Sequence, residues 1–199
     1  LRPGAPWTCT LRHFGTTDGP FRHIKPKFVD RRKHYNEVLV SGDRRKLLEA
    51  AQDAIGDART EFPAAFWEVM AKRCVQSMHL FEPFELAILS RAFDVHDVKL
   101  PRGPDVYGSV VTRALAARNF SGLSIVVLLD VLSRRMAPGQ SERKQQLFQI
   151  LGRMASDVMW ELSAPHAIGI LEALTSADVR DPALCSRVAR KLLMQLDGL

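Results

Sequence analysis

The densest group of side chains that could do chemistry is the segment Asp94-Val95-His96-Asp97, with two carboxylates and one imidazole. Such groups can together hold a divalent cation. A metal site needs further ligands, however; the six histidines are scattered and no C-x-x-C pair occurs. Cys74 and His79 are poorly spaced for one face of a helix. We therefore expect no metal site, and we expect the segment to be a solvated loop, over 94–103, beside a helix end.

Nucleophilic catalysis has one formal candidate, Ser141-Glu142-Arg143-Lys144, which has the S-x-x-K spacing. The companion motifs of that enzyme class are absent, so Ser141 is better explained as a helix N-cap. The motifs G-x-S-x-G and H-E-x-x-H and the glycine-rich phosphate loops are also absent. The sequence therefore predicts a non-enzymatic protein with no catalytic residue, no cofactor and no small-molecule substrate.

Positive charge is concentrated near the N-terminus. Residues 1–46 hold 11 Lys/Arg and four Asp/Glu, a net charge of about +7, whereas residues 47–199 hold 17 and 18, about −1. Proline and glycine punctuate residues 1–40 too densely for a long helix, so we expect an extended arm there. Partners that carry phosphate suit such a charge distribution.

Aromatic residues alternate with the cations of this arm. They could stack on bases while the cations neutralise phosphates, or they could anchor the arm in a protein groove. Composition leaves both possibilities open. We assign the RNA contacts of the arm to Arg12, Arg22, Lys25, Lys27, Arg31, Arg32 and Lys33.

Apolar residues recur at helical spacing through residues 41–199, and capping or proline residues precede most of the runs. The pattern predicts about eight helices. A strand could hide only at Ile125-Val126-Val127. Leu89, Leu128 and Leu129 are expected in the central core.

A period of roughly 40 residues organises these helices, within the range that is typical of stacked supersecondary units. The second apolar blocks of successive periods align on Glu82, Ser121 and Ser163. Units of this kind cannot bury their apolar faces alone and must stack. The sequence therefore predicts an all-α protein: a short solenoid of antiparallel helical hairpins over 41–199, with the basic arm over 1–40.

Arg73, Arg113 and Arg153 recur at equal intervals, one period apart, in the same predicted helical setting. On stacked hairpins they would form a ladder that could follow phosphates. Alternatively, each arginine packs its stem along its own hairpin and pairs its head with an acid. We favour the second interpretation.

Composition narrows the class of protein. Apolar content of 46% and charge of 25% are ordinary for a folded soluble protein. Three distant cysteines indicate a reducing compartment and no disulfide framework. The longest apolar run, 123–132, is far short of the roughly 20 residues of a membrane helix, so no transmembrane segment is expected.

The hairpin pattern over residues 44–197 resembles the organellar helical-repeat families, the heptatricopeptide-like and FAST-kinase-like arrays. The likeness is carried by residues 84–93, 126–132 and 168–174. It implies a mitochondrial matrix protein tied to RNA or to the ribosome. We therefore expect a structural subunit of a mitochondrial ribosome, whose partners are ribosomal RNA and neighbouring subunits. The alternatives are a freestanding organellar RNA-binding or processing factor, and an accessory subunit of a respiratory or ATP-synthase complex.

Overall fold

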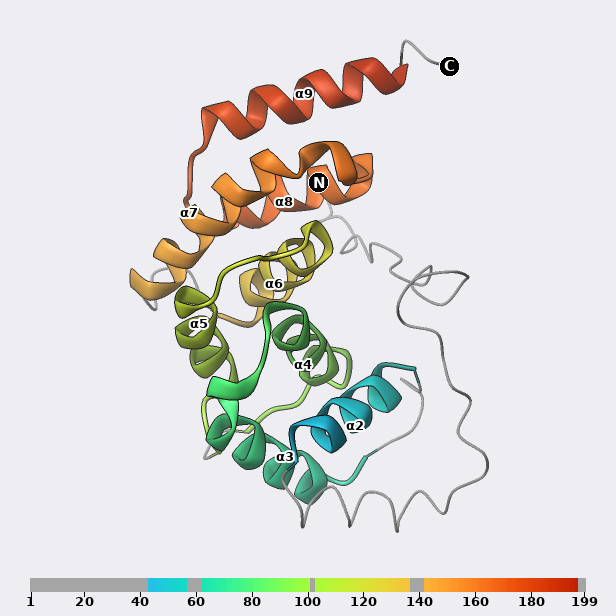
Figure 1. The fold of residues 1–199 in the computed structure, drawn as a ribbon, viewed down its shortest axis with the longest axis vertical. Helices are drawn as coiled ribbons and strands as arrows, with labels where there is room; N and C mark the ends of the chain where they lie inside the picture. Colours follow the sequence, from blue (N-terminus) through green and yellow to red (C-terminus); the bar gives the residue numbers. More distant parts are fainter. Residues whose placement is uncertain (1–42, 57–61, 101–102, 137–141, 197–199) are drawn as a thin grey trace, which may run out of the picture.

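The computed structural model describes residues 43–56, 62–100, 103–136 and 142–196, and all regular structure in these ranges is helical (Figure 1). Eight α-helices and two single-turn 3-10 helices follow one another. They are α2 (Arg44–Gly56), α3 (Ala64–Gln76), η2 (Met78–Leu80), α4 (Pro83–Val95), α5 (Val106–Ala116), α6 (Gly122–Arg135), α7 (Glu142–Asp157), η3 (Met159–Glu161), α8 (Ala164–Ser176) and α9 (Pro182–Leu196). The all-α prediction is confirmed, and the segment 125–127 is helical. The arm over 1–40 lies outside the described residues.

The helices form a two-layer stack. Helices α2, α4, α6 and α8 pack side by side in sequence order and form the inner layer. Helices α3, α5, α7 and α9 pack in the same way and form the outer layer, and the chain climbs from α2 and α3 to α9 (Figure 1). The hairpins α3–α4, α5–α6 and α7–α8 are the repeating units, so the predicted solenoid of helical hairpins is confirmed.

The three alignment residues of the sequence repeat are the N-caps of inner helices. The hydroxyls of Ser121 and Ser163 accept hydrogen bonds from the backbone N–H groups of Ser124 and His166. Glu82 caps α4, and its own backbone N–H donates to the Glu85 carboxylate at 2.8 Å in a reciprocal capping box. The alignment of the sequence repeat therefore marks where each of these inner helices begins.

Each inner helix buries the same four positions counted from its N-cap. They are Leu47, Ala50, Ala51 and Ala54 in α2; Leu86, Leu89, Ser90 and Phe93 in α4; Ile125, Leu128, Leu129 and Leu132 in α6; and Ala167, Ile170, Leu171 and Leu174 in α8. All are buried except Leu171, which is half-buried. Helices α4 and α6 are buried on most sides because they lie in the middle of the stack. The predicted core residues Leu89, Leu128 and Leu129 have no exposed surface.

The outer helices also share one buried register. Its repeated positions are Met70, Ala71 and Cys74 in α3, Val110, Val111 and Ala114 in α5, and Leu151, Gly152 and Ala155 in α7; Val188 and Leu192 continue it in α9. A β-carbon at Gly152 would lie 3.2 Å from Leu174 Cδ1, so glycine lets α7 approach α8 closely. Cys74, Ala114 and Ala155 are thus equivalent. Because they are not equally spaced in the sequence, the number of residues from one outer helix to the next is not constant.

Helices α4 and α8 end in the same way. Asp97 and Asp178 follow them with φ of 45° and 55°, a left-handed conformation that usually favours glycine. The next N–H groups, of Val98 and Val179, donate back to Phe93 O and Leu174 O at 3.1 and 2.9 Å. Because α4 runs through Val95, the expectation that a solvated loop begins at residue 94 is wrong.

Leu128→Ala is expected to lower the free energy of unfolding by about 2–5 kcal/mol, because the fully buried side chain of α6 leaves a cavity among packed helices. Urea unfolding followed by circular dichroism measures the change. Leu193→Ala, at a side chain 60% exposed, is the control and should cost less than about 0.5 kcal/mol. Equal effects at the two positions would contradict the core assignment.

Candidate nucleic-acid interface

The residues assigned to RNA contact by sequence all lie outside the described residues, so that assignment stays a prediction. They are Arg12, Arg22, Lys25, Lys27, Arg31, Arg32 and Lys33. The described part of the chain begins at Asp43, which accepts a hydrogen bond from the backbone N–H of Arg45 at 3.2 Å and so caps α2. What the structure adds concerns the cations of the helical stack.

The three equally spaced arginines do not occupy one structural position. Arg73 and Arg113 each precede a buried small residue of the outer register and are half-buried. In α7 the residue at that position is Met154, and Arg153 lies one position earlier, on the surface. One residue turns a helix by about 100°. The three arginines therefore do not form the ladder that was the less favoured interpretation, because the register of α7 lies one position further along the chain than the sequence period predicts.

Cations of α5 and α9 bind backbone carbonyls of the hairpin that precedes them. The half-buried Arg113 donates from Nε to Phe81 O at 3.0 Å, and Lys191 Nζ, at the equivalent position of α9, donates to Trp160 O at 3.4 Å. The more exposed Arg187 donates from Nη1 to Ser156 O at 2.7 Å. The carbonyls near a helix C-terminus lack intrahelical partners and carry the negative end of the helix dipole. Arg113 thus meets a carbonyl, and not the acidic partner that was expected.

A different set of equivalent residues points outward from the same helices. In each outer helix the residue just before the half-buried position is exposed. The half-buried residues are Arg73, Arg113, Met154 and Lys191, and the exposed ones are Lys72, Thr112, Arg153 and Arg190. At Thr112, where the set has no cation, Arg143 Nη1 approaches the Thr112 hydroxyl oxygen at 3.4 Å from α7. We call Lys72, Arg143, Arg153 and Arg190 the exposed ladder.

The two layers differ in charge. The four outer helices carry nine Lys/Arg and three Asp/Glu, a net charge of +6. The four inner helices carry six of each, a net charge of zero. Acidic caps add two negative charges to each layer, Asp105 and Asp181 outside, Asp43 and Glu82 inside, and so leave the difference unchanged. The net charge of about −1 counted over residues 47–199 does not reveal this difference between the two layers.

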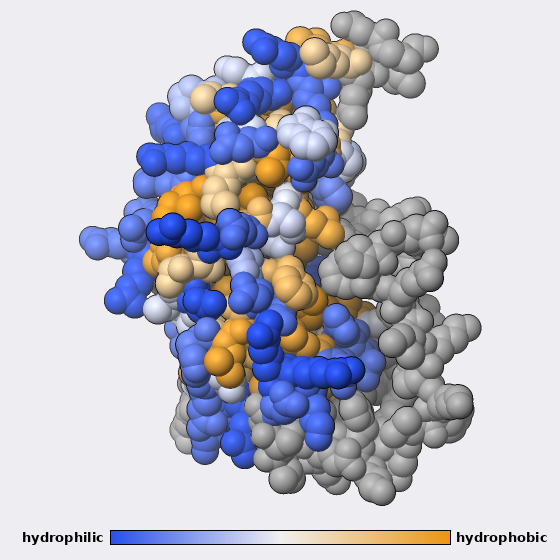
Figure 2. All heavy atoms as spheres, viewed as in Figure 1, coloured by the Kyte–Doolittle hydropathy of each residue, from blue (hydrophilic) through white to orange (hydrophobic). Residues whose placement is uncertain are grey.

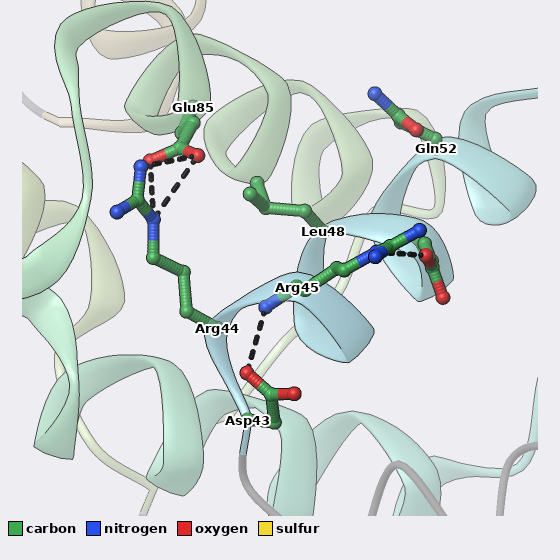
Figure 3. A pocket seen from close by; sticks show the side chains of 7 residues that line it. Asp43, Arg44, Arg45, Leu48, Gln52 and Glu85 are labelled. Carbon is green, nitrogen blue, oxygen red and sulfur yellow. Dashed lines mark hydrogen bonds and ion pairs between the residues drawn. The ribbon is translucent and has the colours of Figure 1, made fainter.

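The inner layer pairs its charges across neighbouring helices. Arg44 of α2 donates from Nη2 and Nε to the nearly buried Glu85 carboxylate of α4 at 2.8–3.1 Å (Figure 3). The bond to Glu85 raises the pKa of Arg44. The pair borders an open depression of about 440 Å³, whose other lining residues are Asp43, Arg45, Leu48, Glu49 and Gln52. The Arg45 guanidinium lies 3.0 Å from the Glu49 carboxylate, and in Figure 3 it points away from Glu85. The Arg44–Glu85 contact joins two helices and the Arg45–Glu49 contact lies within α2, so these side chains converge on no common point.

A buried carboxylate organises the C-terminal end of α4. The Asp94 side chain is 2% exposed and meets Arg91 at 2.9 Å, Arg134 at 3.0 Å and Arg135 at 2.7 Å. Arg135 also donates to Asp94 O at 2.7 Å and to the Asp97 carboxylate. One guanidinium from α6 therefore binds both the last turn of α4 and the left-handed residue that ends it.

The remaining side chain of the sequence-predicted polar segment has an unrelated role. His96 Nε2 lies 2.8 Å from Ala54 O of α2, and its ring packs on those of Phe62 and Trp67. Asp94 and Asp97 thus both bind Arg135 of α6, whereas His96 contacts α2. In the described ranges no three His, Cys, Asp or Glu side chains gather as a possible metal site.

Two other side chains with reactive groups remain protonated at neutral pH. Burial raises the pKa of the Cys74 thiol to about 12 and that of the Tyr107 hydroxyl to about 12. Neither group is therefore activated as a nucleophile or base.

No helix among the described residues has both the length and the apolar character to cross a bilayer.

No protein-family model matches this chain, and no curated protein matches it in sequence.

Asp94→Asn is expected to lower the free energy of unfolding by about 3–5 kcal/mol, because it leaves three arginines around a neutral, buried amide. Asp130→Asn is the control: that carboxylate also meets Arg134, at 2.7 Å, but is 38% exposed and should cost at most about 1 kcal/mol. Denaturant unfolding of both variants measures the two changes in free energy of unfolding. A cost at Asp94 no larger than that at Asp130 would show that the buried cluster does not hold α4 and α6 together.

Asp97 gives the fold a defined response to acid. Hydrogen bonds from Arg135 and then Lys99 hold the pKa of Asp97 below its ordinary value of about 3.9. A lowered folded-state pKa contributes stability above about pH 4, which is lost as pH falls through the folded pKa. Asp97→Asn tolerates the left-handed backbone but lacks the charge. Wild type should therefore lose more stability than Asp97→Asn between about pH 5 and pH 2 in urea titrations, and parallel pH profiles would refute this.

Proposed function

We propose that this chain is a non-enzymatic structural subunit of a mitochondrial ribosome, in which the helical stack is a scaffold and residues 1–40 contact ribosomal RNA or neighbouring subunits. The observation that carries the proposal is the net charge of about +7 in residues 1–46, beside a helical region whose inner layer is neutral. A large excess of Lys/Arg with interleaved aromatic rings fits a phosphate-bearing partner.

The helical stack supports the scaffold part of the proposal. Its polar side chains of chemical interest are engaged in holding helices together: Asp94 and Arg135 join α4 to α6, Arg44 and Glu85 join α2 to α4, and Arg113 joins two hairpins. A solenoid built in this way offers extended surfaces to partners. These surfaces, and not a pocket, are therefore the parts to which we assign the function.

The mitochondrial ribosome as the site of action rests on the resemblance of the hairpins to organellar helical-repeat arrays. The same features suit a freestanding RNA-binding factor of the organelle. An accessory subunit of a respiratory complex would use the arm for protein docking instead. The three possibilities differ in how the chain fractionates, and one experiment separates them.

The test is sedimentation of tagged chain from an organelle lysate, with and without ribonuclease. Wild type should sediment with ribosomal particles and move to light fractions after ribonuclease. Replacing Arg12, Arg22, Lys25, Lys27, Arg31, Arg32 and Lys33 by Gln should abolish heavy sedimentation, because it removes seven cations. In the matched control each Arg becomes Lys and each Lys becomes Arg, which keeps the charge and should keep heavy sedimentation.

Other outcomes select the alternatives. A wild-type chain that sediments with membrane complexes and ignores ribonuclease would exclude the ribosome and favour the respiratory subunit. A chain that stays light but binds RNA when purified alone would instead indicate the freestanding factor.

A further inference from the structure

The exposed ladder crosses the outer layer from α3 to α9. The buried register fixes Lys72, Arg153 and Arg190 at equivalent positions, and Arg143 lies against Thr112, the α5 residue at that position. Arg143 and Arg153 both lie on α7, ten residues and so about 15 Å apart along its axis, while Lys72 and Arg190 lie on α3 and α9. Figure 2 shows hydrophilic side chains along the left edge of the molecule, where Figure 1 places α5 and α7.

No carboxylate of the described residues pairs with a ladder cation. Within the described ranges Lys72, Arg153 and Arg190 have no acidic partner, and Arg143 meets only a hydroxyl. The acids of the outer helices are Glu68, Glu142 and Asp157, and of these Asp157 lies 3.9 Å from Arg187, which is not part of the ladder. A row of free cations on helices with a net charge of +6 attracts a polyanion.

From this arrangement we infer that the exposed ladder is a second RNA contact, one that binds the sugar-phosphate backbone of double-helical RNA. The aromatic residues of the outer helices favour backbone contact over base recognition. Phe66, Trp67 and Phe148 are buried, and Tyr107 is half-buried, so these helices offer no exposed ring on which bases could stack. The exposed Trp160 lies beyond the end of α7, in η3. Double-stranded RNA is recognised by shape and by backbone contacts, which cations held on packed helices supply.

The inference rests on the proposed association with RNA but not on the arm. The arm has interleaved aromatic residues and therefore suits unpaired RNA, whereas the ladder suits paired RNA. The two contacts can therefore be separated by substitution and by probe.

The experiment measures binding of the full chain to a duplex RNA hairpin and to a single-stranded RNA of the same length, each over a salt series. The test variant is Lys72→Gln with Arg153→Gln and Arg190→Gln. Each phosphate contact contributes about 0.7–0.9 to the slope of log K against log salt, so the slope for the hairpin should fall by about 2. Single-strand binding should change little.

Two control variants accompany the test. Lys99→Gln, Arg118→Gln and Arg180→Gln remove the same net charge from exposed positions outside both the outer helices and residues 1–46, and the hairpin slope should stay near wild type. Lys72→Arg, Arg153→Lys and Arg190→Lys keep the ladder charge and should bind as wild type. Unchanged melting temperatures show that the variants are folded.

The outcomes separate this inference from the proposed function. Equal slope changes in the ladder variant and its charge-matched control would show a general charge effect and overturn the inference. So would a ladder variant that binds the hairpin as wild type does, while the arm variant with seven Gln substitutions still loses RNA; the proposed function would then stand alone. A wild-type chain that binds neither RNA would overturn both.

Discussion

Each hairpin of this protein has apolar side chains on two sides, and it can bury them only against the hairpins before and after it. Inner helices meet this requirement with the same four positions, and α2 meets it with three alanines where α6 has three leucines. The outer helices follow a register of their own, in which Gly152 allows α7 to lie against Leu174. Because every helix must keep its buried face toward its neighbours, the rotation of each helix about its axis is fixed. That rotation then determines where every polar residue lies.

The charges follow from this geometry. The Glu85 and Asp94 carboxylates between inner helices are nearly buried, and an unpaired charge there would be costly. Glu85 and Asp94 are accordingly matched by arginines, from their own helix or from its neighbours, and Asp94 receives three of them. In the outer layer, half-buried cations take the free carbonyls at helix ends, while cations at the adjacent position reach solvent. A Lys or Arg side chain of an outer helix thus holds the stack together at the half-buried position, and at the preceding position it is exposed to solvent.

Two separate basic regions suit a protein held within a large assembly. Two contacts on the same chain raise the effective concentration of each for its partner, so modest individual contacts combine into firm attachment. The neutral inner layer is then left to maintain the scaffold. The interactions that hold it are short, paired and partly buried, as in the contact of Arg44 with Glu85, and are therefore less sensitive to salt than surface contacts.

The amino-acid sequence by itself determined the helical class, the positions of the inner N-caps and the central leucines, because caps and apolar periodicity are local signals. The second apolar blocks align on Glu82, Ser121 and Ser163, and each of these residues caps an inner helix. Only the tertiary structure decided which cations are equivalent. Arg153 keeps the period of the sequence repeat, yet the packing of α7 on α8 shifts its register by one position and turns it outward. The tertiary structure also placed Asp94 in a helix beneath three arginines, since the contact with Arg135 joins residues far apart in the chain and leaves no local trace. Separation of charge between layers is likewise invisible in a linear count, because it depends on which helices share a face.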